Sequence, residues 1–390
     1  MNTEHLDTHL DSIDADGYLL DASGSNGDQR YLSGFDASDP FVTLYEPTAS
    51  ERPNIHVLIG ETEYGRTTRE SNATSVETFS THRSASDGSE RSRGGAIASF
   101  VRDRDVSRVC VPERFPHGVA SELRAAGIDV TTDESAAVTR TRAIKSAGEI
   151  DHIRSVLDRV EAAFERIEAV LASADVVDGW LYHGDDPLTG RTLTREIRRE
   201  LVDRDLTTEH VLVGCGADSA DPHGSTDGPI AAGESIVVDI FPADRHTAYH
   251  ADTTRTFVVG EPDPALGRLY DQVDRALDIA IDTLGPGVTG EQVNEQVLGF
   301  LEGKGHRSRR THDSFESGAL HYVAHGIGLD VHELPVCLPD EPPLEPGAVV
   351  AVEPGLYYPE IGGVRLEDCV LITETGCERL SRHERRFVVD

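Results

Sequence analysis

Three apolar runs of this chain each contain a carboxylic acid at a position where a buried strand normally holds an apolar residue. Asp239 lies in SIVVDIF, Glu353 ends the apolar run of AVVAVEPG, and Glu367 lies in GGVRLEDCVLI. A carboxylate buried on a central strand costs several kcal/mol unless it is paired or bound to a metal ion. These runs therefore predict a fold that brings buried acids to a common partner.

A fourth acid stands at the start of the next β-branched run. Asp252 immediately precedes the run TTRTF. A hairpin between this run and the run of Asp239 would bring the two carboxylates to one point. By itself, the pair of acids is explained equally well by a structural role, in which Asp252 pairs with Arg255 or caps a turn.

Histidines cluster in and beside the segment AHGIGLDVHE. Glycines follow His325 closely, so the backbone can approach and leave access to the imidazole. A lone histidine in such a place is more often a satisfied hydrogen-bonding group than a ligand. His321, His325 and His332 lie within twelve residues of one another, however, and this clustering favours a functional site.

Lone acids in apolar strands and an imidazole have a common solution, a pair of divalent cations whose charge balances four carboxylates. An oxygen-rich site with one imidazole favours hard or borderline metals such as Mn²⁺, Co²⁺, Fe²⁺ or Zn²⁺. Two such ions share a bridging water, lower its pKa and polarise a substrate carbonyl. The implied reaction is hydrolysis.

The charge balance limits the partners of this chain. Seventy Asp and Glu against 36 Lys and Arg leave a formal charge of −34, which would repel nucleic acid and anionic membranes. Only Lys145 and Lys304 are lysines, and this scarcity beside many acids is typical of proteins from the high-salt cytoplasm of a halophile. Periodic apolar blocks argue against disorder.

Cysteine usage and the first residues indicate a soluble, cytoplasmic protein. The five cysteines are odd in number, widely spaced and without a CxxC pair, which argues against both a disulfide framework and a thiolate zinc site. No basic region precedes an apolar run at the N-terminus, and no stretch approaches the roughly 18 apolar residues that a membrane span needs.

The apolar pattern changes near residue 140, so we expect two domains, 1–140 and 141–390. The first has short β-branched runs separated by Gly, Pro and Asn, which predicts a smaller α/β domain without catalytic residues. In the second, helices and strands come in blocks, which predicts an α+β domain. Its helices are expected over 153–171, 193–201, 266–281 and 290–302, and its strands over 235–241, 253–259, 348–353 and 364–372.

The motifs VVDIF, HADTTRTF, HGIGLDVHE, VEPG and GGVRLED, in this order, resemble those of the pita-bread metallopeptidases. That family includes Xaa-Pro aminopeptidases, prolidases, methionine aminopeptidases and the metal-free creatinases. The resemblance begins near residue 145 and implies a pita-bread catalytic domain over 141–390. A fainter resemblance in YLSGF implies a creatinase-type N-terminal domain over 1–140.

Residue by residue, the resemblance implies a site for two metal ions. Asp239 would be a bidentate ligand of one ion, and Asp252 and Glu367 would bridge both. His325 and Glu353 would complete the other ion's ligands. All five ligand types are present in the chain.

The resemblance also places four residues at the substrate. His223 and His332 align with histidines that contact the substrate and its tetrahedral intermediate. His321 falls where the Xaa-Pro branch keeps another active-site histidine, although a core or surface role explains it equally well. Arg365 matches the arginine of the motif G-G-x-R-x-E-D and is expected to bind substrate.

The activity implied by the resemblance is that of an Xaa-Pro metallo-aminopeptidase or dipeptidase, acting on short peptides with proline in second place. A hydroxide that bridges the ions would attack the first peptide carbonyl, with His332 at the oxyanion and Glu353 passing the proton to the leaving nitrogen. A creatinase-like hydrolase of a non-peptide C–N bond and a non-catalytic peptide-binding module are the alternatives, and the retained ligands argue against both. The family also suggests a homodimer.

Overall fold

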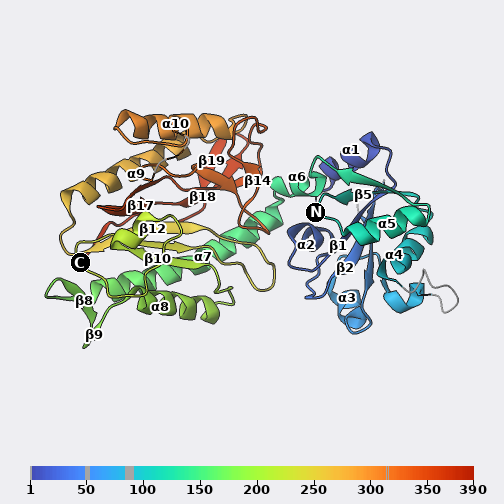
Figure 1. Cartoon of the computed structure of the whole chain (residues 1–390), viewed down its shortest axis with the longest axis horizontal. Helices are drawn as coiled ribbons and strands as arrows, with labels where there is room; N and C mark the ends of the chain where they lie inside the picture. Colours follow the sequence, from blue (N-terminus) through green and yellow to red (C-terminus); the bar gives the residue numbers. More distant parts are fainter. Residues whose placement is uncertain (1, 49–52, 84–91, 313, 315) are drawn as a thin grey trace. The chain divides into compact units, whose positions relative to one another are not determined.

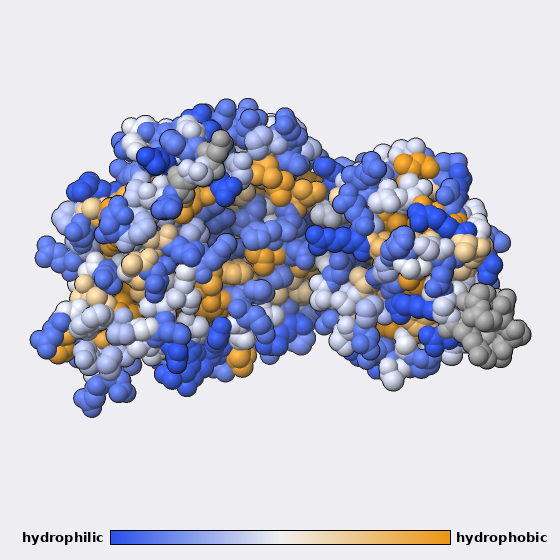
Figure 2. Space-filling view, in the orientation of Figure 1, coloured by the Kyte–Doolittle hydropathy of each residue, from blue (hydrophilic) through white to orange (hydrophobic). Residues whose placement is uncertain are grey.

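In the computed structural model, which describes residues 2–48, 53–83, 92–312, 314 and 316–390, the chain divides into two compact units, Met1–Arg142 and Ala143–Asp390 (Figure 1). Hydrophilic residues dominate the face seen in Figure 2, as the charge of the chain requires. None of the helices in the described ranges is long and apolar enough to cross a membrane. All five cysteines are free thiols.

The first unit is built on a six-stranded mixed sheet in the order β4-β3-β2-β1-β5-β6. Its strands are β1 (Gly17–Ala22), β2 (Phe41–Glu46), β3 (Asn54–Ile59), β4 (Ser75–Thr78), β5 (Arg108–Pro112) and β6 (Asp129–Asp133). Its helices are α1 (Glu4–Ser12), α2 (Gly27–Ser33), α3 (Tyr64–Glu70), α4 (Arg93–Arg102), α5 (His117–Ala125) and α6 (Ala137–Ala143), with a 3-10 turn at Phe79–His82.

One face of this sheet packs against helix α4. Leu19, Leu44 and Leu58 lie in one buried cluster with Ile97 and Phe100 of α4. Side chains of successive strand residues point to opposite faces, so these three leucines lie on the same face of the sheet, and α4 packs on it. The α/β character predicted for this part of the chain is confirmed.

The second unit combines helices with two main sheets, ordered β10-β11-β12-β20 and β14-β13-β15-β18-β19. Its helices are α7 (Ala147–Ala172), α8 (Gly190–Asp203), α9 (Pro264–Thr283) and α10 (Gly290–Gly303), with a 3-10 turn at Gly216–Ala220. Its strands are β7 (Asp175–Val177), β8 (Trp180–His183), β9 (Asp186–Pro187), β10 (Val211–Cys215), β11 (Ile236–Ile240), β12 (Thr253–Val259), β13 (Ala324–Gly326), β14 (Glu333–Val336), β15 (Val349–Val352), β16 (Gly355–Tyr358), β17 (Gly362–Arg365), β18 (Asp368–Thr373), β19 (Gly376–Arg379) and β20 (Val388–Val389).

Figure 1 shows α7 and α8 along one side of these strands and α9 and α10 along the other. Helix α7 begins with a capping box, in which Ser146 and Glu149 satisfy each other's free backbone groups. Its buried stripe, which includes Val156, Val160 and Phe164, follows the predicted three- and four-residue steps. The four helices expected in this part of the chain are all present, and the α+β prediction is confirmed.

One strand prediction was wrong. The run 364–372 forms two strands, because β17 ends at Arg365 and β18 begins at Asp368. Strand β17 pairs with β16, whereas β18 pairs with β15 and β19. Glu367 lies in the break, where its backbone N–H donates to the Thr254 carbonyl at 3.0 Å. The chain passes from one sheet to the other at this point, and Glu367 belongs to neither strand.

Candidate metal centre

Strands β11 and β12 carry the first two acids. Asp239 on β11 stands opposite Thr254 of β12 in their antiparallel pairing, and Asp252 immediately precedes β12. The predicted hairpin is therefore present. The alternative in which Asp252 pairs with Arg255 is wrong, since the Arg255 guanidinium binds Asp368 instead.

The other sheet supplies the histidine and a third acid. His325 on β13 is paired with Ala351 of β15, and Glu353 directly follows β15. The backbone N–H of Glu353 donates to the Val323 carbonyl at 2.8 Å, which holds this acid beside the histidine strand. The two sheets thus present their functional residues at one place.

The side chains of these strands converge. The His325 Nε2 atom lies 3.7 Å from Asp252 Oδ2, 3.8 Å from Glu353 Oε1 and 3.9 Å from Glu367 Oε1. Ligand atoms of Asp252, His325 and Glu367 all lie within 4.8 Å of one another. Asp239 lines the same hollow, which has a volume of about 420 Å³. The five predicted metal ligands are therefore gathered around one space.

Unpaired oxygens in this hollow test whether a metal fits. Asp239 Oδ1 and Glu367 Oε1 are buried and accept no hydrogen bond from any described residue. Buried carboxylate oxygens without a partner are rare in folded proteins unless an ion or water occupies the space. The donor set, four carboxylates and one imidazole, suits divalent cations of the hard or borderline class. The residues present fit such ions.

Mutual repulsion of the acids also favours bound cations in this hollow. Burial raises the pKa of Asp252 well above its usual range, and the charges of Glu367 and Asp239 raise it further. Burial, followed by the charges of Glu353 and Asp239, also raises the pKa of Glu367. Cations balance such a cluster without protonation of its acids.

Two of the predicted substrate histidines line the hollow near the acids. The ring of His332 lies edge-on to that of His325, with centroids 4.4 Å apart. Burial, together with the charge of His325, lowers the pKa of His332. His223 is exposed, and its backbone N–H donates to Asp221 Oδ1 at 3.0 Å, which fixes the turn that carries it.

His321, Tyr357 and Arg365 form a hydrogen-bonded chain along the wall. His321 Nδ1 is 2.8 Å from the Tyr322 carbonyl, so this nitrogen carries the proton and donates. His321 Nε2 then accepts from the Tyr357 hydroxyl at 2.8 Å. Arg365 Nη1 donates to the same hydroxyl at 2.9 Å. Both nitrogens of His321 are engaged.

Arg365 is bound to protein groups through all its guanidinium nitrogens. Its Nη2 donates to Asp239 Oδ2 at 2.7 Å, its Nη1 to the Pro222 carbonyl at 3.0 Å and its Nε to Thr254 Oγ1 at 3.1 Å. The residue lines the hollow but is only 4% exposed. This arginine holds Asp239 in place.

The structure adds residues that sequence reasoning missed. Thr254 donates to Glu367 Oε2 at 2.9 Å, and Tyr357 orients His321 and Arg365. Their places within HADTTRTF and beside VEPG could have drawn attention to them. Arg309 lies outside every motif, and nothing in the sequence distinguished it. The wall also has an apolar part, formed by Leu212, Pro222, Phe241, Leu320 and Val331.

A buried ionic network stands behind the acids. Arg255 is fully buried and donates to the Glu367 carbonyl at 2.6 Å and to Asp368 Oδ1 at 2.8 Å. Asp368 is fully buried too, and it also binds Arg379 at 2.8 Å and Arg385 at 3.1 Å. The network joins β12, through Arg255, to the start of β18, through Asp368, which directly follows Glu367.

A second buried ion pair holds the His332 segment. Lys145 Nζ lies 2.8 Å from Glu333 Oε1, with both side chains almost completely buried. The other Glu333 oxygen accepts from the Asp330 backbone N–H at 3.2 Å. Because Glu333 directly follows His332, the pair fixes the backbone that presents this histidine to the hollow.

His383, beside the network, predicts a pH dependence of stability. It is buried and stacks on Phe164, and burial, followed by the charges of Arg255 and Arg386, lowers its pKa from 6.5 to about 4. Between these values the unfolded chain binds a proton that the folded chain does not. His383 therefore contributes a loss of stability as the pH falls, of about 2 kcal/mol between pH 7 and pH 5.

Urea unfolding of the wild type and of His383→Phe at both pH values checks this prediction. Phenylalanine keeps the stacking and cannot be protonated, so the variant should lose about 2 kcal/mol less on acidification. The exposed His117, changed to glutamine, serves as the control and should leave the wild-type loss unaltered. An equal loss in wild type and His383→Phe would contradict the expected role.

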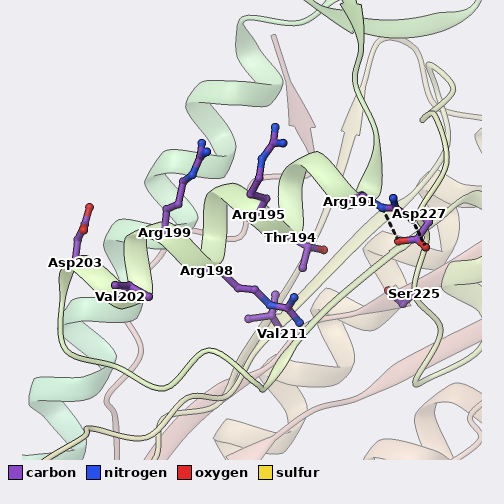
Figure 3. A pocket seen from close by; sticks show the side chains of 10 residues that line it. All are labelled: Arg191, Thr194, Arg195, Arg198, Arg199, Val202, Asp203, Val211, Ser225 and Asp227. Carbon is purple, nitrogen blue, oxygen red and sulfur yellow. Dashed lines mark hydrogen bonds and ion pairs between the residues drawn. The ribbon is translucent and has the colours of Figure 1, made fainter.

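A larger hollow, of about 710 Å³, lies along α8 and is rich in arginine. Figure 3 shows that Arg195 and Arg199 point to one side of the helix and Arg198 to the other. Arg191 is paired with Asp227 at 2.8 Å, and Arg199 with Glu196 at 2.6 Å. The guanidinium groups do not converge on one point, in contrast to the acids of the smaller hollow.

Convergent acids and a histidine, carried by the strands of an α+β unit, define a metal-binding site of the hydrolytic class. The sequence profile of metallopeptidase family M24 matches residues 138–374, more than half of the chain. The chain therefore belongs to metallopeptidase family M24. The family membership predicted from the motifs is confirmed.

Individual relatives agree with this assignment. The chain is 30% identical over 253 residues to the Xaa-Pro dipeptidase of Pyrococcus furiosus, covering 63% of this chain and 69% of that protein. It is 32% identical over 261 residues to the probable dipeptidase PepE of Mycobacterium tuberculosis, covering 64% of this chain and 61% of that protein, which is less than two thirds of its length.

A solved structure shows that the likeness extends to the fold of the whole chain. The prolidase from Pyrococcus horikoshii OT3 superposes with a TM-score of 0.79 at 24% identity, over 99% of each chain. The expected pita-bread fold with a smaller N-terminal part is confirmed.

Proposed function

We propose that this chain is an exopeptidase with two metal ions that hydrolyses the bond before proline in short Xaa-Pro peptides. The observation that carries the proposal is the convergence of Asp252, His325 and Glu367 around one hollow, with Glu353 and Asp239 on its wall. The relative from Pyrococcus furiosus is an Xaa-Pro dipeptidase, which supports the substrate class.

Five residues would hold the ions, namely Asp239, Asp252, His325, Glu353 and Glu367. Divalent ions in such a site lower the pKa of water and polarise a carbonyl oxygen. We propose Mn²⁺ or Co²⁺ as the physiological metal, with Zn²⁺ or Fe²⁺ as alternatives. A site with one imidazole among oxygen ligands is compatible with all four ions.

The chain's own groups would handle the proton and the substrate. Glu353 is the least buried of the acids, with 22% of its side chain exposed, so it can accept the proton of the attacking water and pass it to the leaving nitrogen. His332 and His223 would hold the substrate carbonyl oxygen through hydrogen bonds. His321 and Arg365 would act by positioning, since their nitrogens are bound to protein groups.

The shape of the wall supports the preference for proline. Leu212, Phe241, Leu320 and Val331 offer an apolar surface beside the acids, which suits a pyrrolidine ring. The N-terminal ammonium group of the substrate would lie toward the four acids that line the hollow.

We extend the proposal to the rest of the chain. Residues 1–140 would form a creatinase-type N-terminal domain and 141–390 the catalytic domain, and the division into two compact units supports this. We also propose a homodimer, as the family resemblance suggests, and a cytoplasmic location, which the five free thiols support.

Removal of the metal tests the proposal. Treatment with a chelator should lower the hydrolysis of Ala-Pro by a factor of about 100 or more, because the remaining groups cannot activate water at neutral pH. Mn²⁺ or Co²⁺ should restore activity. Ca²⁺ should not, because it prefers six to eight oxygen ligands. Chelator-resistant cleavage, or the absence of cleavage of any Xaa-Pro peptide after metal loading, would contradict the proposal.

A further inference from the structure

Exposed apolar side chains gather at one place in the second unit. Of the six large apolar residues that are exposed in the described part of the chain, four lie on one hairpin or on the helix that follows it. They are Val176, Val177, Trp180 and Val202. Single apolar residues on a surface are ordinary, but a group of them marks a contact surface.

The hairpin comprises residues 175–187, with strands β7, β8 and β9, and is called the Trp180 hairpin below. Its first turn is a two-residue loop at Asp178 and Gly179, whose φ angles are 49° and 85°. Positive φ at both positions is the type I′ turn that Asp-Gly favours. The Leu181 backbone N–H donates to the Ile230 carbonyl at 2.9 Å. The Trp180 hairpin is therefore a built element that is fixed to the body of the unit.

One face of the Trp180 hairpin is apolar and uncovered. Val177 pairs with Trp180, and Tyr182 pairs with Pro187, so these four side chains share a face of the small sheet. Three of them are exposed and Tyr182 is half-buried. Exposed acids surround this face, and they form no ion pair with any described residue. They are Asp175, Asp178, Asp185 and Asp186.

The larger hollow, along α8, has the opposite charge. Arg198 reaches over Val211 in Figure 3 and uses only its Nε, which donates to the Thr208 carbonyl at 3.1 Å. Its volume of about 710 Å³ is within the range of pockets that take up aromatic groups. One stripe of the helix lines it, at three- and four-residue steps. This stripe consists of Arg191, Thr194, Arg198 and Val202.

The Trp180 hairpin and the α8 hollow complement each other. The hairpin offers an indole ring surrounded by carboxylates, and the hollow offers guanidinium groups beside Val202 and Val211. An arginine stacks favourably on the face of a tryptophan, and both residue types are common anchors of protein interfaces. The guanidinium groups are spread along the helix, which suits an extended acidic partner better than a small anion.

A second copy of this chain is the partner that fits both surfaces. Only Leu188 and Thr189 separate β9 from α8, and Figure 1 shows the hairpin and the helix along the same edge of the unit. Two copies related by a twofold axis can therefore fill both hollows at once, each with the other's hairpin. A different acidic protein would fill the hollow and leave Trp180 in water.

We propose that the Trp180 hairpin of one copy docks in the α8 hollow of a second copy, and that the contact is reciprocal. This inference rests on the homodimer of the proposed function, for which it names the contact surface. Chains with a charge of −34 repel one another, so association needs a local contact between opposite charges. The acids of the hairpin and the arginines of α8 supply this contact, and Trp180 is its apolar anchor.

Tryptophan fluorescence tests the contact directly, because Trp180 is the only tryptophan of the chain. The wild type is diluted from about 100 μM to about 0.1 μM. Analytical ultracentrifugation gives the mass, and the emission maximum reports whether Trp180 is buried. We expect the emission to move to shorter wavelength over the same concentrations at which dimers form.

Charge reversal tests the partner surfaces. Arg195→Glu with Arg198→Glu should weaken association by at least about 100-fold and keep the emission at its long-wavelength value. Asp185→Arg with Asp186→Arg should do the same. The chain with all four changes has the net charge of the wild type and again opposes unlike charges, so it should recover association.

Two further variants complete the comparison. Trp180→Ser should weaken association by at least about 100-fold, as judged by mass alone. Tyr64→Ser is the matched control, because Tyr64 is exposed to a similar extent, 44% against 45%, and lies in the first unit. It should leave the dissociation constant unaltered. All the substituted residues are exposed, so circular dichroism should show an unchanged fold.

The outcomes separate the contact surface from the homodimer itself. A dimer that forms without a change in the emission of Trp180 overturns the surface and leaves the homodimer standing. A wild type that stays monomeric at about 100 μM refutes both. Failure of the fourfold variant to recover association overturns the reciprocal contact. No readout uses peptide hydrolysis, so the result does not depend on the proposed peptidase activity.

Discussion

Replacing Asp252 with asparagine is expected to lower kcat/KM for Xaa-Pro peptides by at least about 1,000-fold. Asp252 is buried, and its Oδ2 lies 3.7 Å from His325 Nε2 within the cluster of acids. Residues that merely orient a metal ligand are worth about 10- to 100-fold, so a residue in the ligand cluster should cost more. Hydrolysis of Ala-Pro and the metal content after dialysis measure the effect.

The stability of the metal-free variant separates a lost ligand from a damaged fold. Asparagine removes one negative charge from a group of buried, mutually repelling acids. The free energy of unfolding without metal should therefore stay the same or rise, while the added stability from bound Mn²⁺ should be lost. Asp227→Asn, at an exposed acid paired with Arg191, is the control and should retain activity. Normal turnover in Asp252→Asn would refute its assignment.

Replacing Asp368 with asparagine is expected to destabilise the protein by about 3–5 kcal/mol. Asp368 and Arg255 are both completely buried, and the substitution leaves the Arg255 charge without its counter-ion. Because Arg255 also donates to the Glu367 carbonyl, the affinity for Mn²⁺ should fall by about 10- to 100-fold. Urea unfolding and metal titration measure the two effects.

A variant at the rim of the same network is the matched control. Asp278 also binds Arg385, at 2.8 Å, but 46% of its side chain is exposed. Asp278→Asn should cost less than about 1 kcal/mol, because solvent screens exposed pairs. If Asp368→Asn does not fold, Asp368→Glu, which keeps the charge, should recover folding. A loss below about 1 kcal/mol in Asp368→Asn would show that the network contributes little.

A helix or strand could be predicted from the sequence where the residues that cause it lie within the same segment. Helix α7 could be predicted because its buried stripe and its capping box lie within the segment itself. The break between β17 and β18 could not, because the run from Val364 to Ile372 is apolar enough for one strand. Only the contacts of Glu367 with Thr254, which is distant in sequence, explain why the chain leaves one sheet there.

The candidate site divides in the same way. The acids and His325 stood out because each interrupts an apolar run or lies between glycines. The motif around Arg365 predicts substrate binding, but it does not indicate the bonds of this arginine to Asp239 and Tyr357, which come from distant or separate segments. The place of Arg309 in the lining of the hollow could not be predicted, because an arginine in a polar segment of an arginine-rich chain does not differ from its neighbours.

The amino-acid sequence alone determined which carboxylic acids are buried in apolar strands, because an acid within such a strand is recognisable from its immediate neighbours. It also determined membership of metallopeptidase family M24 through motifs of a few residues each. The tertiary structure decided which groups share a space and which protein groups bind the guanidinium of Arg365. These depend on contacts between segments more than 100 residues apart, such as the bond from Arg365 to Asp239, which local patterns do not encode.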